Sequence, residues 1–502
     1  MVLRLVAVIF SGLLLAAAFP KWDQSYLLAV ALIPLFWAIE GQTPKRAFWL
    51  GLAGGLAFYV GLLYWIFFVC HVYGGLPVAA AVAVMLLLSG YLALYRGVWA
   101  WGVSRGAARG LSPLWWGPVL WVTLELIQTY LLSGFPWELL GYGLYRNPFF
   151  VQFADLTGVY GLSFLLVLLN FCLYRLIFPG RSSRLSYSVL ALLILFLWGG
   201  YGFLRLNAVE KQIAQSPKMK VAVVQGNIEQ GQKWDPANLL ATINKYDTLT
   251  RKVSLDKPHL IVWPETAAPF WFIRDKEFTA QLRQMARESQ ANLLFGSPAL
   301  EFTGEGQRRL FNRAYLLSPH GEVVGYYDKA HLTPYGEYVP LQRLFFFIPK
   351  MVPMIGDFAE GPAGMVLPLP EGGVGPLICF ESIFGEIARA QVKNGAQLLV
   401  NITNDAWFGT TSAPYQHLSM AVLRTVENRV SLARAANTGI SAFIAPDGRL
   451  LWTSELNIPE AKSWDLPWLP GGTLYTKIGD TFAYTCALLT ALGLLWGWRR
   501  RK

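Results

Sequence analysis

Charged residues are scarce in this sequence, and their scarcity excludes an ordinary soluble protein. Only 15% of the 502 residues are Asp, Glu, Lys or Arg, 54% are hydrophobic, and the mean hydropathy is +0.39. Soluble domains carry about 25% charged residues. Much of this chain is therefore expected to lie in lipid.

The net charge of +11 does not indicate a nucleic-acid partner. The basic excess lies in residues 1–206 and in the tail 499–502, whereas residues 207–498 hold 26 basic and 26 acidic side chains. A polynucleotide-binding surface needs a clustered basic patch on a folded domain. We therefore expect no nucleic acid as a partner.

Cysteines and metal-ligand patterns are also scarce. Four cysteines are present, and Cys70, Cys172 and Cys486 lie in strongly apolar segments. Only Cys379 lies in the polar part of the chain, which excludes an internal disulfide there. No Cys-x-x-Cys pair occurs, and the five histidines are scattered without ligand spacing. We expect no metal and no cofactor.

Long apolar runs dominate the first 206 residues. A membrane helix needs about 20 apolar residues, and the pattern predicts about eight transmembrane helices, seven in residues 1–206 and one in residues 479–498. The first two runs are short, so they form either two full spans or a short hairpin. The runs lie near 5–19, 26–39, 47–69, 77–101, 114–133, 158–178, 185–204 and 479–498.

Basic residues concentrate in alternate loops, and this bias predicts the orientation. The loops between are poor in Lys and Arg, and positively charged loops stay in the cytoplasm. Both termini are therefore expected in the cytoplasm, and residues 207–478 on the far side. The basic groups are Lys45 and Arg46, then Arg96, Arg105 and Arg109, then Arg175, Arg181 and Arg184, and finally the tail Arg499–Lys502.

Residues 218–470 indicate one α/β domain, flanked by linkers at 207–217 and 466–472. Short β-rich runs alternate with amphipathic helices, which is typical of strands interleaved with helices around a packed sheet. Strands are predicted at 220–225, 260–263, 292–296, 314–317, 374–379, 397–402 and 441–445. Helices are predicted at 236–256, 276–290, 384–394 and 414–430.

Three segments of this domain each place a reactive side chain at the end of an apolar strand, where ligand sites of open α/β sheets lie. A thiol is mostly protonated at neutral pH, so Cys379 needs a base or a cation beside it. Glu265 is able to take the proton, and Lys329 is able to face the oxyanion of a tetrahedral intermediate. Together these residues predict acyl transfer through the Cys379 thiol. The segments are Ile261–Thr266, Tyr326–Tyr338 and Gly375–Glu381.

In this order, the motifs Trp-Pro-Glu, Asp-Lys-x-His-Leu-x-Pro-x-Gly-Glu and Ile-Cys-x-Glu resemble the nitrilase (carbon–nitrogen hydrolase) superfamily with its Glu–Lys–Cys triad. Joined to the apolar runs, they closely resemble the apolipoprotein N-acyltransferase family over essentially the whole chain. Gln225–Ile228, Trp234 and Asn401–Gly409 match as well. The resemblance implies an αββα sandwich, the bacterial inner membrane and a periplasmic catalytic domain.

The resemblance also implies the roles of the site residues. Glu265 is expected to be the general base, Lys329 the oxyanion-stabilising cation and Cys379 the nucleophile. Three supporting residues are implied: Glu337, which orients the lysine, Glu381, and Phe380, whose backbone N–H faces the oxyanion. Phe380 stands where the family has tyrosine. Trp234, Trp407 and Phe408 are expected to bind substrate.

The implied reaction has two steps. The thiol attacks an acyl ester of a membrane phospholipid, leaving a thioester and a lysophospholipid. The α-amine of the N-terminal diacylglyceryl-cysteine of an apolipoprotein then takes the acyl chain, which completes lipoprotein maturation. The expected partners are thus the phospholipid, the apolipoprotein and the bilayer. Aromatic runs at 267–273 and 344–354 suit an acyl groove or a membrane interface.

Two alternatives are weighed against this interpretation. A membrane-tethered nitrilase-type amidase acting on a small amide shares the triad, but the apolar loops and a membrane region far larger than an anchor disfavour it. A transporter or scaffold with a degenerate domain is disfavoured by the intact Glu–Lys–Cys set. Only Glu40, Arg96 and Glu125 lie in or near apolar segments, where transporters place ionisable groups.

Overall fold

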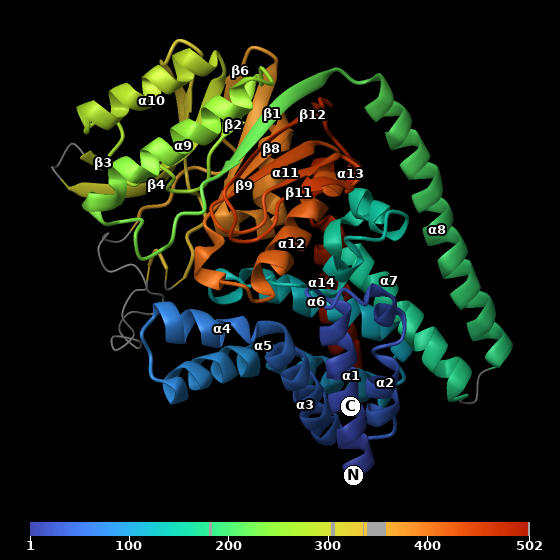
Figure 1. The fold of residues 1–502 in the computed structure, drawn as a ribbon. Helices are drawn as coiled ribbons and strands as arrows, with labels where there is room; N and C mark the ends of the chain where they lie inside the picture. Colours follow the sequence, from blue (N-terminus) through green and yellow to red (C-terminus); the bar gives the residue numbers. More distant parts are fainter. Residues whose placement is uncertain (180–182, 303–306, 335, 339–357, 500–502) are drawn as a thin grey trace. The chain divides into compact units, whose positions relative to one another are not determined.

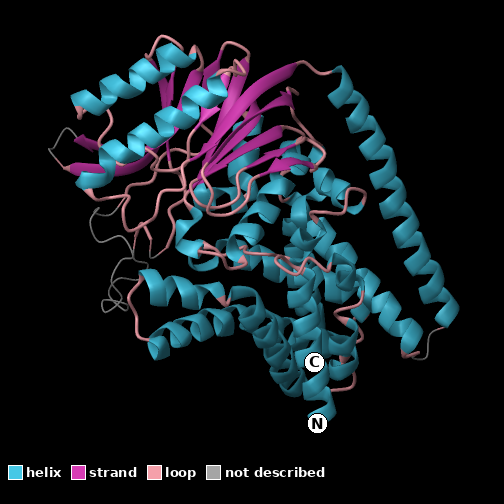
Figure 2. Ribbon diagram, viewed as in Figure 1, coloured by secondary structure: helices cyan, strands magenta, loops and turns pink. Residues whose placement is uncertain are grey.

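The computed structural model describes residues 1–179, 183–302, 307–334, 336–338 and 358–499, with side chains described to residue 496. The chain divides into two compact units, Met1–Ala208 with Ile478–Lys502, and Val209–Lys477. In the described residues the first unit is helical, and the second contains both sheets (Figures 1 and 2).

The helices of the first unit coincide with the apolar runs. Four stretches are long and apolar enough to cross a membrane: Pro44–Leu63, Val78–Ala107, Phe150–Ile177 and Arg184–Gln215. Val2–Ala18, Ser25–Ile39 and Thr481–Trp496 are apolar but shorter. Length and composition thus support a membrane-embedded region with four spans among the described residues, against a prediction of about eight. The helices are α1 (Val2–Ala18), α2 (Ile33–Ile39), α3 (Pro44–Leu63), α4 (Trp65–Phe68), α5 (Val78–Ala107), α6 (Pro113–Tyr130), α7 (Ala154–Ile177), α8 (Arg184–Gln215) and α14 (Thr481–Arg499).

The first two apolar runs pack against each other. The guanidinium of Arg4, near the start of α1, donates hydrogen bonds to the carbonyl oxygens of Ala38 (2.8 Å) and Glu40 (2.9 Å), at the end of α2. Pro34 lies in the first turn of α2, where the N–H that it lacks has no helical partner. The proline therefore starts this helix rather than breaking it.

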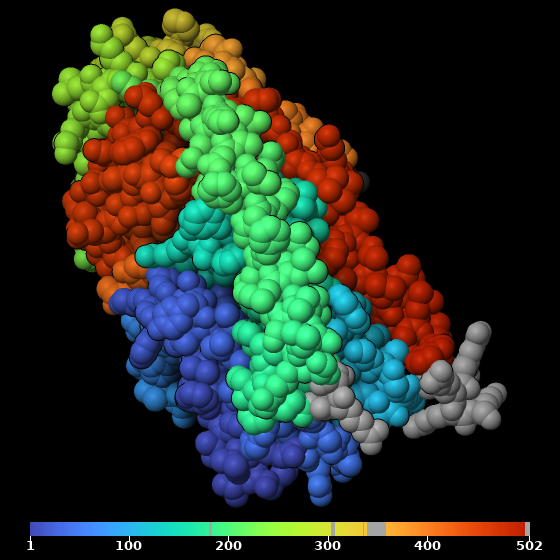
Figure 3. Space-filling view, turned by 90° about the vertical axis from the view of Figure 1, so that its right-hand side faces the viewer, coloured from blue at the N-terminus to red at the C-terminus, as the bar shows by residue number. Residues whose placement is uncertain are grey.

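Helix α8 leaves much of its apolar surface uncovered. Leu185, Phe196 and Leu204 are 70%, 75% and 69% exposed, and Figure 3 shows the helix as a green column at the surface. Contiguous apolar surface of this extent marks a contact with lipid or protein. The helix also continues to Gln215, so the predicted linker at 207–217 is wrong for most of its length. Its Ala, Glu, Lys and Gln residues are good helix formers.

The second unit contains two six-stranded sheets, in the orders β12-β1-β2-β3-β4-β5 and β11-β10-β9-β8-β7-β6. In each sheet three neighbouring strands are parallel, β1 to β3 and β7 to β9, and the strands beside them are antiparallel. The strands are β1 (Lys218–Gln225), β2 (Leu260–Val262), β3 (Asn292–Phe302), β4 (Arg308–Leu317), β5 (Val323–Asp328), β6 (Leu367–Leu369), β7 (Gly372–Ile378), β8 (Ala396–Thr403), β9 (Ser431–Ala436), β10 (Ala442–Ile444), β11 (Leu450–Thr453) and β12 (Glu460–Pro467).

The two sheets pack face to face between layers of helices. Along β1, Val221 and Val223 join a core that contains apolar residues of both sheets, whereas Ala222 and Val224 join a core with the helices over the first sheet. Burial on both faces explains the continuous apolar runs, as expected for parallel strands. Helices α9 (Leu239–Ser254) and α10 (Lys276–Ser289) cover the first sheet, and α11 (Gly385–Lys393) and α12 (Ala413–Asn428) the second. The predicted αββα sandwich is present.

Candidate active site

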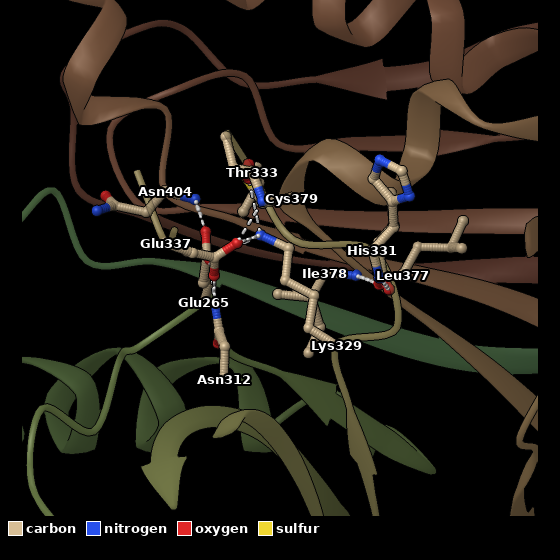
Figure 4. Close-up of polar contacts among 12 residues, drawn as sticks. Glu265, Asn312, Lys329, His331, Thr333, Glu337, Leu377, Ile378, Cys379 and Asn404 are labelled. Atoms are coloured by element: carbon tan, nitrogen blue, oxygen red, sulfur yellow. Dashed lines mark hydrogen bonds and ion pairs between the residues drawn. The ribbon is translucent and has the colours of Figure 1, made fainter. Parts of the chain in front are cut away.

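Glu265 lies just beyond the carboxyl end of β2, where Pro264 prevents the strand from continuing. Its Oε1 accepts a hydrogen bond from Nδ2 of Asn312 (2.7 Å), and its Oε2 accepts one from the backbone N–H of Asn404 (3.0 Å). Asn312 lies on β4 and Asn404 follows β8, so one donor comes from each sheet. The buried carboxylate therefore has a fixed direction (Figure 4).

Lys329 follows β5 and is only 1% exposed. Its Nζ lies 2.8 Å from Oε2 of Glu337 and 3.9 Å from Oε1 of Glu265, and it donates to Oγ1 of Thr333 (3.1 Å). Burial by itself lowers the pKa of Lys329, but the two carboxylates outweigh burial and raise it above its ordinary value. The side chain is therefore a fixed ammonium at neutral pH.

Asn312 joins the two carboxylates of the site. Its Nδ2 donates to Oε1 of Glu265 and to Oε1 of Glu337, both at 2.7 Å. An amide nitrogen carries two hydrogens, so one side chain satisfies both acceptors. The Asn312 amide and the Lys329 ammonium together hold the carboxylates of Glu265 and Glu337 close to each other inside the buried site. Our sequence interpretation missed Asn312, although an asparagine inside an apolar strand is unusual.

Cys379 begins a sharp turn directly after β7. Its φ of +53° is rare for a residue with a side chain, and such a conformation costs about 1–3 kcal/mol. Its carbonyl oxygen is held by the hydroxyl of Ser382 and by Nε2 of His417, each at 3.1 Å. The surrounding structure thus fixes the strained backbone and aims the thiol at the end of the strand.

Behind this turn lies a fully buried polar network. Asp405 meets Nδ1 of His417 at 3.1 Å and accepts a hydrogen bond from Arg434 (2.7 Å). Burial opposes the charge of Asp405, but Arg434 and His417 hold its pKa below the ordinary range. The carboxylate stays ionised and fixes the histidine that contacts the Cys379 carbonyl.

The Cys379 thiol is protonated at rest. Burial raises its pKa, Glu265 raises it further and Lys329 lowers it, and the net result lies above the usual range. Figure 4 shows Cys379 beside the Lys329 ammonium and the two carboxylates. A thiol in this state attacks a carbonyl only if a base removes its proton during the reaction. Glu265 is the carboxylate that the geometry offers.

Glu381 links the lysine to the nucleophile. The side chain is fully buried, and burial raises its pKa to about 7 in spite of the hydrogen bonds that it accepts. Its Oε1 accepts hydrogen bonds from Tyr327 and from the loop that contains Lys329, and its Oε2 accepts one from the end of β7. Its donors are the hydroxyl of Tyr327 (2.8 Å) and the backbone N–H groups of Ala330 (2.6 Å), His331 (3.1 Å) and Ile378 (2.6 Å).

The aromatic residues predicted at the site lie on the same strand-end loops. Trp234 is half-buried in the loop after β1, and Trp407 and Phe408 are half-buried in the turn that follows Asn404. The ring of Phe380 packs against Phe384, with centroids 5.3 Å apart.

The two aromatic runs proposed for an acyl groove have different outcomes. Within 267–273, Phe270 and Phe272 belong to the core under the helices of the first sheet, so a lipid-facing role for the whole run is wrong. Ala267 and Ala268 lie in the same core, whereas Ile273 is 56% exposed. The run 344–354 lies outside the described residues.

A second lysine, Lys233, also enters the site. Its Nζ donates to the backbone carbonyl oxygen of Glu265 at 2.9 Å, and the side chain is 4% exposed. The sequence interpretation named its neighbour Trp234 but not Lys233. Among the described residues, no group of three or more His, Cys, Asp or Glu is arranged to hold a metal ion.

Comparison with known families gives two matches along the chain. The family model "Apolipoprotein N-acyltransferase N-terminal domain" matches residues 11–172, and "Carbon-nitrogen hydrolase" matches residues 220–460. Two curated relatives are both named apolipoprotein N-acyltransferase. The protein of Geobacter metallireducens is 45% identical in an alignment that covers 98% of this chain and 95% of the relative. The protein of Pasteurella multocida is 30% identical in an alignment that covers 96% of this chain and 93% of the relative.

A solved amidase from Nesterenkonia sp. aligns with part of the chain. It is 23% identical, covers 54% of this chain and 97% of its own, and has a TM-score of 0.39. A similarity of that size says nothing about the reaction.

Proposed function

Because this chain belongs to the apolipoprotein N-acyltransferase family, we propose that its Cys379 thiol carries an acyl chain from a membrane phospholipid to the N-terminal amine of a lipoprotein. The chain is a membrane-embedded bacterial acyltransferase of the carbon–nitrogen hydrolase superfamily. The observation that carries the residue assignment is the buried cluster of Glu265, Lys329 and Glu337 beside Cys379.

In the first step, Glu265 takes the proton from the thiol as the sulfur attacks the ester carbonyl. The carbonyl electrons move to the oxygen, where the Lys329 ammonium and the backbone N–H of Phe380 stabilise the negative charge. The intermediate collapses with cleavage of the ester C–O bond, and Glu265 returns its proton to the departing lysophospholipid oxygen. A thioester on Cys379 remains.

In the second step, the neutral α-amine of the diacylglyceryl-cysteine attacks the thioester carbonyl. Glu265 accepts a proton from the attacking nitrogen, the C–S bond breaks, and the proton returns to the sulfur. An amide is more stable than a thioester, so the transfer proceeds without a nucleotide. Trp234, Trp407 and Phe408 are the proposed contacts for the acyl chains, because they lie on the loops that supply the cluster.

The finer membrane arrangement is part of the same proposal. We place about eight spans in the bacterial inner membrane, both termini in the cytoplasm and the α/β domain, residues 218–470, in the periplasm. The basic loops support this orientation, and the exposed apolar side chains of α8 support lipid contact.

A transfer assay tests the function. Purified full-length protein in phospholipid vesicles is mixed with a synthetic diacylglyceryl-cysteine peptide, and the peptide is analysed by mass spectrometry. We expect one added acyl chain, attached as an amide to the α-amine. A protein that hydrolyses small amides but leaves the peptide unmodified would be an amidase and would overturn the proposal.

A further inference from the structure

Lys233 is a buried lysine that the mechanism above does not use. It lies in the loop between β1 and α9, and its Nζ donates at 2.9 Å to the main-chain carbonyl of Glu265. Lysine is almost never fully buried unless its charge is compensated. The negatively charged groups that act on it are Glu265, after β2, and the thiolate form of Cys379, after β7.

The charge balance of the cluster indicates why a second lysine, Lys233, is buried there. Glu265 and Glu337 contribute two negative charges, and Lys329 contributes one positive charge. Nearby Asp405 is already matched by Arg434. The cluster therefore holds at least one negative charge in excess before an oxyanion forms, because Glu381, with a pKa of about 7, is partly ionised as well. Uncompensated buried charge is costly, and a second ammonium reduces the excess.

We propose that Lys233 is the second cation of the active site, a positioning residue that holds Glu265 through its main-chain carbonyl and stabilises the negative charge arising when Cys379 attacks. The inference rests on the proposed function. No bond or proton of Lys233 changes: the proton passes from Sγ to Glu265, the S–C bond forms, and the carbonyl electrons move to the oxygen.

This role makes the first step sensitive to alkaline pH. Burial lowers the pKa of Lys233 to about 8, although Glu265 and Cys379 oppose the shift. The pKa of Lys329 is raised, so that lysine keeps its charge in the same range. As the pH rises through about 8, Lys233 loses its charge and Lys329 keeps its own. Acyl-enzyme formation therefore slows.

The test measures the first step alone, with phospholipid and no acceptor, so that titration of the acceptor amine does not interfere. The rate of acyl-enzyme formation on the full-length protein is followed by intact-mass spectrometry between pH 6 and pH 10. We expect the wild-type rate to fall above about pH 8. Lys233→Met should be at least about tenfold slower at pH 7 and show no such fall. Lys233→Arg should move the fall to higher pH, because a guanidinium stays charged.

Lys245→Met is the matched control. Lys245 is half-buried, and it also donates to a main-chain carbonyl of this loop, that of Asn227 (3.2 Å). This variant should keep the wild-type rate and pH profile.

A flat wild-type profile between pH 7 and pH 9.5 would overturn the inference even if the variants fail to fold. So would a Lys233→Met protein with the wild-type rate and profile. A wild-type protein that forms no acyl-enzyme would instead overturn the proposed function, and this inference with it.

Discussion

The position of Lys329 depends mainly on one carboxylate. Glu337 contacts its Nζ at 2.8 Å, whereas Glu265 lies at 3.9 Å. The closer carboxylate therefore holds the cation, and the more distant one remains available as a base. Glu265 and Glu337 have the same functional group, and their different distances from Lys329 give them different roles.

Glu337→Gln should weaken the lysine as a cation. The variant removes the group that most raises the pKa of Lys329, so this pKa falls. We expect acyl-enzyme formation about 10²-fold slower at pH 7, because the Lys329 ammonium loses the carboxylate that holds it at 2.8 Å. A mass-spectrometric time course of acyl-enzyme formation at pH 7 measures the rate. Glu322→Gln, at an exposed turn, is the control. A Glu337→Gln protein with the wild-type rate would contradict the role of Glu337 in holding Lys329.

The site residues that the sequence did not predict, Asn312 and Lys233, are brought to the site by the fold. Glu265, Lys329 and Cys379 were predictable because each follows an apolar strand in a chemically suggestive motif. Asn312 and Lys233 belong to no such motif, and they reach the site only because β4 and the loop after β1 pass beside Glu265. Spatial neighbours of this kind are invisible in one sequence.

At the scale of elements, apolar patterns predicted seven strands and missed the strands that lack such a pattern, including the fully buried β9. The seven predicted strands are present, with boundaries shifted by a few residues. Edge strand β12 carries polar residues on a half-exposed surface, and β9 is rich in alanine and contains Arg434, so neither has a strand-like pattern. Arg434 is buried because Asp405 is beside it, a pairing that no local rule predicts.

Close contact between β3 and the loop after β2 sets the position of the base. A Cβ added to Gly296 would lie 2.8 Å from Cα of Glu265, closer than two such atoms can approach. The glycine is therefore required by the loop that carries the carboxylate.

Gly296→Ala should displace Glu265 while the sandwich still forms. We expect acyl-enzyme formation to fall about 10²-fold, because a misplaced base loses its geometry, with a smaller change in thermal unfolding. Gly231→Ala, where the added Cβ meets nothing within 4 Å, should behave as the wild type. Equal activity of the two variants would contradict this account of the loop.

At the scale of the whole molecule, composition already separated the chain into a membrane part and a polar part. Hydropathy is a property of local sequence, so the apolar helices were predictable. Helices α1 and α2 are apolar but too short to be recognised as full membrane spans by their length, so the predicted count of crossings exceeds the number of long apolar helices. The side of the membrane was inferred from loop charges.

Cysteine labelling tests the proposed orientation. Ala108→Cys lies in an exposed loop among basic residues, and His320→Cys lies in an exposed turn of the α/β unit. In intact spheroplasts, a membrane-impermeant maleimide should label His320→Cys at once and Ala108→Cys only after permeabilisation. The unsubstituted protein supplies the background from its four native cysteines. The reverse pattern would contradict a periplasmic catalytic domain.

The central claim is that the sulfur of Cys379 carries the acyl chain. Purified protein mixed with phospholipid of one known acyl chain, and analysed by intact mass and peptide mapping, tests it most directly. We predict a mass increase of one acyl group, located on Cys379, removed by hydroxylamine and absent from Cys379→Ala. Acyl transfer to the acceptor by Cys379→Ala, or an acyl group on another residue of the wild type, would contradict the account.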